Sequence, residues 1–146
     1  MQVTPLPRPD AEELDALVRL WEASVRATHD FLAPEDLDLY RTLVRREALP
    51  GTELYVLRGT DGKFAAFAGI SGEHLEMLFV APERRGEGLG RQLVEHLVRT
   101  RGIRTVDVNE QNAQAAGFYA RLGFRIAGRS AADASGRPYP ILHLTR

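Results

Sequence analysis

The chain has 146 residues, with 19 Lys and Arg, 20 Asp and Glu and no cysteine, so its formal net charge at pH 7 is −1. This length predicts one domain over residues 1–146, and this charge balance does not favour nucleic acid or an anionic membrane as a partner. Without cysteine the chain has no disulfide, no thiolate metal site and no thiol nucleophile, and no metal is expected.

The first third of the chain predicts two helices. Acidic residues follow Asp10 in what would be a first helical turn, and apolar residues then recur at helical spacing up to Val25. The segment Thr28–Leu32 interrupts this pattern, and Pro34 begins a second helix that ends near Pro50. No apolar leader and no membrane-length apolar run stand out, so we expect a cytoplasmic protein.

The remaining two thirds alternate strands with helices. Strands are expected over 54–57, 64–70, 75–80, 105–108, 124–126 and 140–144, with a further short strand over 2–4. A helix follows the third of these and stops at Gly102, and another covers 113–122. This order predicts a mixed α/β fold with antiparallel hairpins at its ends and one parallel crossover in its middle.

A glycine-rich loop joins the strand that ends at Val80 to the next helix. Three glycines alternate with other residues in Gly86-Glu87-Gly88-Leu89-Gly90. Such a loop exposes backbone N–H groups at the positive end of the helix dipole, which suits a pyrophosphate. No Lys follows as in a P-loop, and the sixth position is Arg91 rather than the glycine of a dinucleotide fingerprint. The alternative is a glycine-rich turn that only caps a helix.

A second motif runs from Asn112 to Phe124. It reads Asn-x-x-Ala-x-x-Phe-Tyr-x-x-x-Gly-Phe and follows the Arg85-x-x-Gly88-x-Gly90 loop after one helix and one strand. Asn112 is expected at a helix N-cap. Phe118 is expected to pack the helix on the sheet and Tyr119 to point partly away. Together the two motifs resemble the conserved core of the GCN5-related N-acetyltransferase family, and further segments resemble its bacterial YjaB-like subgroup.

This resemblance implies a mostly antiparallel sheet flanked by helices, with central parallel strands that splay apart around acetyl-CoA. It implies that the loop amides hold the CoA pyrophosphate, that Asn112 lies near the CoA arm and that Tyr119 acts as general acid near the thioester sulfur. The cofactor-binding residues that it implies are Leu78, Phe79, Val80, Arg85, Gly86, Gly88, Leu89, Gly90, Arg91, Asn112 and Tyr119.

An amine acceptor needs a base, because freeing the lone pair of an amine with a pKa of about 10.4 costs about 4–5 kcal/mol at pH 7. The candidates are His29, His74 and Glu76, and a relaying water is an alternative. Strand alternation places His74 and Glu76 on the same face as Leu78 and Val80. Each candidate also has a structural interpretation: His29 as a helix C-terminal cap, His74 as a turn residue and Glu76 as a solvated strand residue.

We therefore expect an N-acetyltransferase in which a primary amine attacks the thioester directly, since the chain lacks cysteine. The acceptor would be a small molecule, a peptide N-terminus or a lysine, bound by Thr28, His29, Asp30, Phe31 and Tyr139. The alternatives are a non-catalytic CoA-binding sensor and a toxin that acetylates charged tRNA. A homodimer stays open.

Overall fold

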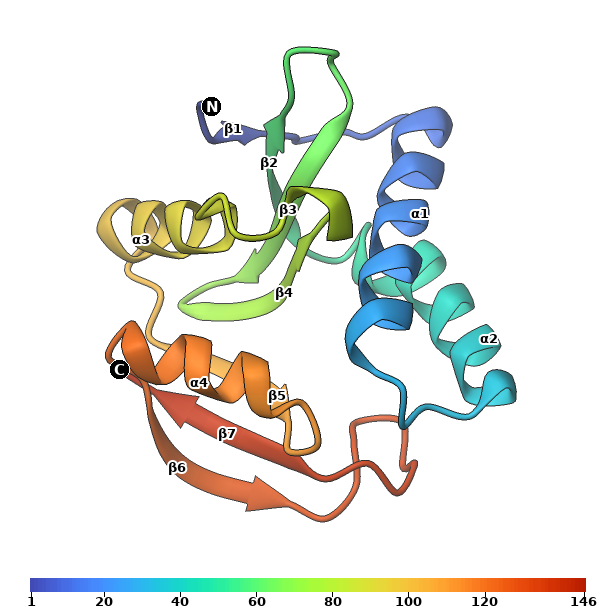
Figure 1. Cartoon of the computed structure of the whole chain (residues 1–146), viewed down its shortest axis with the longest axis vertical. Coiled ribbons are helices and arrows are strands. Elements are labelled where there is room, and N and C mark those ends of the chain that lie inside the picture. The colour runs from blue at the N-terminus through green and yellow to red at the C-terminus, as the bar shows by residue number, and fades with distance from the viewer.

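A computed structural model describes all 146 residues as one seven-stranded sheet with helices on both faces (Figure 1). The strands are β1 (Thr4–Pro5), β2 (Glu53–Arg58), β3 (Phe64–Ser71), β4 (His74–Val80), β5 (Thr105–Asn109), β6 (Arg125–Ser130) and β7 (Ile141–Thr145). The helices are α1 (Ala11–Thr28), α2 (Pro34–Leu43), α3 (Leu89–Arg101) and α4 (Ala113–Arg121), with short helical turns at Val44–Ala48 and Pro82–Arg84. The strand order is β1-β2-β3-β4-β5-β7-β6, and only β4 and β5 run parallel. The expected mixed α/β fold is confirmed.

Local signals in the sequence explain where the helices begin and end. Asp10 caps α1 through a capping box with Glu13, so that the Asp10 carboxylate accepts from the Glu13 N–H at 2.8 Å. Pro34 stands in the first turn of α2, where its missing N–H costs nothing. Gly102 ends α3 in the left-handed conformation at φ 66°. The first strand is displaced from the expected residues 2–4 to Thr4–Pro5, where it pairs with β2.

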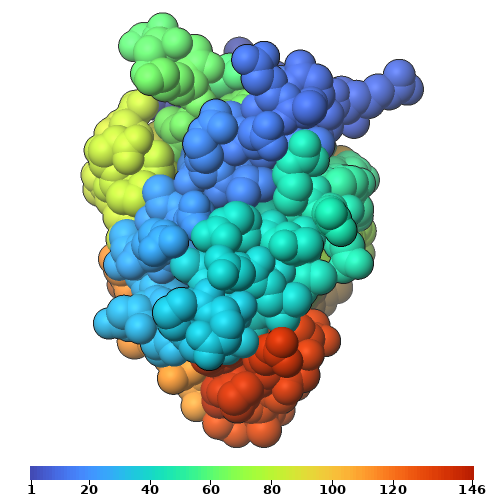
Figure 2. Space-filling model, turned by 90° about the vertical axis from the view of Figure 1, so that its right-hand side faces the viewer, coloured from blue at the N-terminus to red at the C-terminus, as the bar shows by residue number.

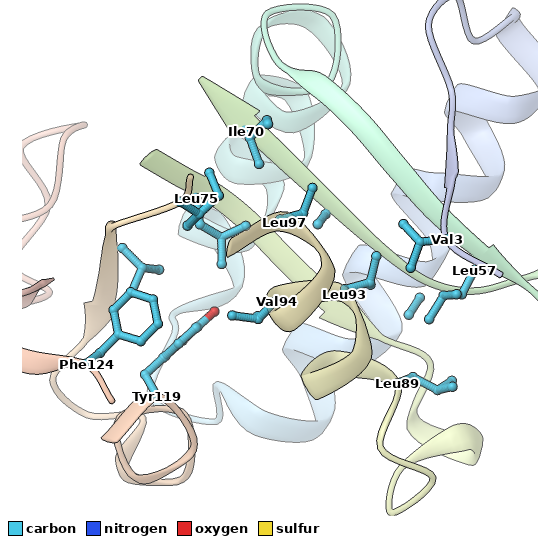
Figure 3. Close-up of a cluster of buried hydrophobic side chains, with 14 of the residues drawn as sticks. Val3, Leu57, Ile70, Leu75, Leu89, Leu93, Val94, Leu97, Tyr119 and Phe124 are labelled. Carbon is cyan, nitrogen blue, oxygen red and sulfur yellow. The ribbon is translucent and has the colours of Figure 1, made fainter. Parts of the chain in front are cut away.

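Two hydrophobic cores lie on the two faces of the sheet. Helices α3 and α4 cover one face, and buried leucines and valines such as Leu93, Val94 and Leu97 fill this first core (Figure 3). Helices α1 and α2 cover the other face over a second core that includes Trp21 and Phe67. Figure 2 shows this α1–α2 face, with the segment between β6 and β7 lying against the lower end of α2. None of the helices combines the length and apolarity needed to cross a membrane.

The two parallel strands diverge after a short paired stretch. Only His74 and Leu75 of β4 pair with β5, opposite Thr105 and Val106. Beyond Leu75 the backbone of β4 has no partner on this side, while the other edge of the strand stays paired with β3 up to Val80. The expected splay of the central strands is therefore present, and it leaves unpaired backbone N–H and C=O groups facing the gap.

A bulge in β4 corrects the expected orientation of Glu76. Gly69 of β3 pairs with Met77 and Ile70 pairs with Leu75, so Glu76 is an extra residue without a partner. Leu75, Leu78 and Val80 consequently belong to the α3–α4 core, whereas Met77 belongs to the α1–α2 core. The prediction that simple alternation places His74 and Glu76 on the face of Leu78 and Val80 is wrong, because the bulge breaks the period-two pattern.

Candidate functional site

A cavity of about 380 Å³ opens where β4 and β5 diverge, at the start of α3. We call it the glycine-loop cavity. Its lining includes every residue that the sequence assigned to the acyl carrier: Leu78, Phe79, Val80, Arg85, Gly86, Gly88, Leu89, Gly90, Arg91, Asn112 and Tyr119. The residues come from β4, the loop, α3 and α4, so the cavity depends on the splay of the sheet.

The wall at the start of α3 is built to accept an anion. Gly88 is the N-cap of α3 with φ 78°, and no side chain caps this helix end. The N–H groups of the first turn therefore have no acceptor within the helix, and the dipole adds partial positive charge. Arg84, Arg85, Arg91 and Arg121 add cationic side chains to the same lining. This combination fits a pyrophosphate.

Adding a methyl group at Gly88 is predicted to weaken donor binding. Gly88 and Gly62 have nearly the same φ, 78° and 80°, and a Cβ at either position meets no atom within 4 Å. Alanine costs about 1–2 kcal/mol in the left-handed region at both. Only Gly88→Ala adds bulk to the cavity lining, so we expect it to raise the KM for acetyl-CoA about tenfold or more. Gly62→Ala is the matched control: equal KM changes in the two variants, measured by steady-state kinetics, would contradict a phosphate cradle at Gly88.

Tyr119 is the most buried residue of α4. Its side chain is 6% exposed and packs edge-on against Phe118 and Phe124, with ring centroids 5.0 and 5.6 Å away. The expectation that Tyr119 points partly away from the packed face is wrong, because the short helix turns this residue into the core (Figure 3). Phe118 packs against the same core and is only partly buried, as expected. Its hydroxyl makes no protein hydrogen bond and is not sealed from the cavity. Burial raises the pKa of this phenol well above its usual range.

The expected cap at Asn112 is confirmed. The Asn112 side-chain oxygen accepts from the Ala115 N–H at 3.2 Å at the start of α4. The same residue lines the glycine-loop cavity. Asn112 therefore positions α4, and with it Tyr119, relative to the diverging strands.

A second cavity, of about 570 Å³, lies between α1, α2 and the sheet. We call it the acidic cavity, because Glu76, Asp107 and Asp133 line it and no Lys or Arg does. Trp21, Leu32 and other apolar side chains form the rest of its wall. Burial acts to raise the pKa of Asp133, but hydrogen bonds from the side chains of Ser135 and Tyr40 and from the backbone of Arg137 and Ser135 together hold this pKa below its usual value. Such a cavity favours a cation on an aliphatic stem.

His29 and Phe79 line both cavities and so mark the place where they meet. His29 is the C-cap of α1, and its backbone N–H donates to the Val25 carbonyl at 2.6 Å. Burial, and after it the positive charge of Arg85, lowers the pKa of His29 below its ordinary value. The imidazole is therefore neutral at pH 7.

The hydrogen bonds of Thr28 determine which nitrogen of His29 carries the proton. The Thr28 hydroxyl donates to the Ser24 carbonyl at 2.8 Å, so its oxygen can only accept from His29 Nδ1, which is 2.8 Å away. Nδ1 therefore carries the hydrogen, and Nε2 keeps its lone pair. In this tautomer His29 can accept a proton at Nε2.

The other residues expected at the acceptor site do not lie together in one cavity. Thr28 lines the glycine-loop cavity, but Asp30, Phe31 and Tyr139 line neither cavity. The Phe31 ring packs at a tilt against the rings of His29 and Tyr139, with centroids 5.3 and 6.0 Å away. Tyr139 is buried, accepts from the Ala33 N–H at 3.2 Å and donates to Asp36. The expectation that Tyr139 faces the acceptor is wrong, because it ties the β6–β7 segment to the start of α2.

His74 and Asp107 belong to a polar network across β4, β5 and β7. His74 lines neither cavity, and its Nδ1 lies 2.7 Å from the Thr105 hydroxyl. The Asp107 carboxylate lies 2.7 Å from His143 Nδ1 and 3.4 Å from His74 Nε2. Two imidazoles thus lie beside one carboxylate at the edge of the acidic cavity.

Sequence reasoning missed Asp107 and Asp133. For Asp107 a signal was present: it alternates with the buried Val106 and Val108, which belong to the α3–α4 core, so it must lie on the opposite face. Asp133 lies in the β6–β7 loop, where no periodicity gives a direction.

Comparison with known proteins decides the family. The family described as "Acetyltransferase (GNAT) domain" matches residues 50–126. The chain is 45% identical over 136 residues to the peptidyl-lysine N-acetyltransferase YjaB of Escherichia coli, covering 91% of this chain and 90% of that protein. The chain belongs to the GCN5-related N-acetyltransferase family. The predicted likeness to the YjaB-like subgroup is also confirmed.

Solved structures agree with this assignment to the GCN5-related N-acetyltransferases. The solution structure of apo YjaB from Escherichia coli superposes with a TM-score of 0.86 at 42% identity, covering 99% of this chain and 97% of that one. The PaiA N-acetyltransferase from Thermoplasma acidophilum, solved with coenzyme A, shares the fold at 18% identity, with a TM-score of 0.70 and full coverage of both chains. Members of this family use acetyl-CoA, and this chain is an acetyl-CoA-dependent N-acetyltransferase. A non-catalytic sensor or a tRNA-acetylating toxin finds no support in these relatives.

Proposed function

We propose that the enzyme acetylates the side-chain amine of lysine in a peptide or protein, with the donor in the glycine-loop cavity and the lysine in the acidic cavity. The observation that carries this proposal is the meeting of the two cavities at His29 and Phe79. The relatives at 41–45% identity over most of the chain are named peptidyl-lysine N-acetyltransferases, which supports the same acceptor.

The residues of the glycine-loop cavity fit the donor. The amides after Gly88 and the side chain of Arg85 would hold its pyrophosphate, and the free backbone edge of β4 from Met77 to Val80 would pair with its pantetheine arm. When bound, acetyl-CoA supplies the activated acetyl group. Phe79 and His29 then form the boundary that the acceptor amine must reach.

The acidic cavity holds the lysine as an ammonium ion and then removes its proton. Glu76, Asp107 and Asp133 attract the cation, while apolar residues such as Leu32 and Trp21 contact the four-carbon stem. His29 Nε2 accepts the proton and so supplies the step that costs about 4–5 kcal/mol for a free lysine at pH 7. The Tyr119 hydroxyl holds the proton that the leaving group requires.

The acceptor is tested with one peptide in several forms. One form has a free lysine and a blocked N-terminus, a second has the reverse, a third has both amines blocked, and a polyamine such as spermidine completes the set. We expect acetyl-CoA-dependent acetylation, detected by mass spectrometry, of the lysine amine alone among the peptide forms. A kcat/KM at least about tenfold higher for the α-amine or for the polyamine would contradict the proposal.

A carboxylate variant checks the same proposal from the side of the enzyme. Glu76→Gln removes one of three charges from the acidic cavity, and we expect the KM for the lysine peptide to rise about five- to tenfold. Glu73→Gln changes an exposed carboxylate three residues away that lines neither cavity, and it should leave KM unchanged. The KM for acetyl-CoA should be the same in both variants.

A further inference from the structure

A third cavity, of about 270 Å³, lies between α3 and α4 beside Arg146. We call it the arginine pocket. Its charged walls are Arg91 and Glu95 of α3, Arg121 of α4 and Arg146 after β7. Three guanidinium groups thus face a single carboxylate, in a chain whose overall net charge is −1.

The ion pairs within the pocket leave positive charge uncompensated. Glu95 pairs with Arg91 at 2.7 Å, which neutralises one of the three cations. Arg121 forms no ion pair with any carboxylate, and Arg146 donates from Nε to the Leu122 carbonyl at 3.0 Å. Two guanidinium groups are therefore available to an anion that enters the pocket.

The arginine pocket is continuous with the glycine-loop cavity. Arg91 and Arg121 line both spaces, one on each side of the boundary. The acetyl donor carries a diphosphate and, separately, a phosphomonoester on its ribose. The helix amides after Gly88 can serve the first group, so the second, with a charge of about −1.5 to −2 at pH 7, requires cations elsewhere.

We propose that the arginine pocket binds the ribose phosphomonoester of the donor, so that the enzyme selects CoA over dephospho-CoA. This inference rests on the proposed placement of the donor in the glycine-loop cavity. Arg121 is the principal contact, because it borders both cavities and has no carboxylate partner. Guanidinium groups match phosphate oxygens with paired, charge-assisted hydrogen bonds.

Binding measurements test this selectivity without an acceptor or turnover. Isothermal titration calorimetry with CoA and with dephospho-CoA gives the ratio of the two dissociation constants for each variant. We expect the unaltered enzyme to bind CoA at least about tenfold more tightly than dephospho-CoA, a difference of about 1.4 kcal/mol in binding free energy. Arg121→Ala should bring the ratio below about threefold, because it should weaken the binding of CoA more than the binding of dephospho-CoA.

Two further variants complete the test. Arg99→Ala removes an exposed arginine of α3 that lines neither cavity, and it should keep the full preference for CoA. Arg146→Ala should also lower the preference for CoA, and it replaces Arg121→Ala in the test if that variant does not fold.

Equal binding of CoA and dephospho-CoA by the unaltered enzyme would overturn the phosphomonoester subsite but not the donor site. An equal loss of affinity for CoA and dephospho-CoA in Arg121→Ala would also overturn the subsite, because it would assign Arg121 to the diphosphate. Failure of both compounds to bind the unaltered enzyme would overturn the donor site itself.

Discussion

Replacing Tyr119 with phenylalanine is expected to lower kcat about a hundredfold or more while leaving the KM for acetyl-CoA within about twofold. The substitution removes only the hydroxyl. The ring keeps its edge-on contacts with Phe118 and Phe124, so the α3–α4 core retains its packing. Steady-state kinetics with a lysine peptide measures both parameters.

The size of this effect follows from the surroundings of the hydroxyl. Burial raises the pKa of Tyr119, so the phenol keeps its proton throughout the neutral range and can act only as a donor. No protein group accepts from it, so the hydroxyl is free to donate to a group bound in the glycine-loop cavity. Without the hydroxyl, no other residue of α4 can supply a proton at this point.

Tyr55→Phe is the matched control for this prediction. Tyr55 lies on β2 outside both cavities, and its hydroxyl contacts Arg101. We expect its kcat to stay within about twofold of the unaltered enzyme. Melting curves of both variants should coincide with that of the parent enzyme. An unchanged kcat in Tyr119→Phe, or a loss that parallels a drop in Tm, would show that Tyr119 has only a packing role.

Replacing His29 with glutamine is expected to lower kcat about a hundredfold and to change the pH profile. Burial and Arg85 lower the pKa of His29, so the imidazole is neutral at pH 7 and protonates only below its ordinary value. A protonated imidazole cannot accept a proton. The kcat of the unaltered enzyme should therefore fall as the pH decreases through this lowered pKa. This decrease is the acid limb of the pH profile, and the His29→Gln variant should lack it.

Two substitutions test whether His29 acts as a general base or only as the C-cap of α1. His96→Gln changes a histidine of α3 that lines neither cavity, and it should keep both kcat and the acid limb. Arg85→Gln removes the neighbouring positive charge and should move the limb of kcat to higher pH, because the charge of Arg85 lowers the pKa of His29. An acid limb that persists in His29→Gln would assign the proton to another group, with Glu76 or a water relay next to be tested.

Much of the fold could be predicted because its signals are local. The capping box at Asp10, the proline at the start of α2 and the left-handed glycine at Gly102 each depend on a few neighbouring residues. The glycine loop and the Asn112 cap are equally local, and all eleven residues expected around the acyl carrier line one cavity. Their spacing along the chain is preserved in space because each group lies on one strand–helix connection.

Orientation was predicted less well than position. Period-two alternation fails at Glu76, because a bulge depends on the pairing of β4 with β3 and not on β4 alone. Helical spacing placed Phe118 towards the core and Tyr119 partly away from it, yet both side chains pack on the core and Tyr119 is the more buried of the two. Tyr139 was assigned to the acceptor, but its hydrogen bonds to Ala33 and Asp36 hold it within the packed layer.

The sequence by itself determined the family and the place of the donor, since two continuous motifs carry both. Only the tertiary structure decided the acceptor side. Glu76, Asp107 and Asp133 come from a bulged strand, a second strand and a loop, and they share a cavity because β4 and β5 diverge and the β6–β7 segment folds back on α2. Burial, and after it the charge of Arg85, lowers the pKa of His29, although the two residues are 56 positions apart in the sequence. Contacts between such distant residues follow from packing and have no local signature.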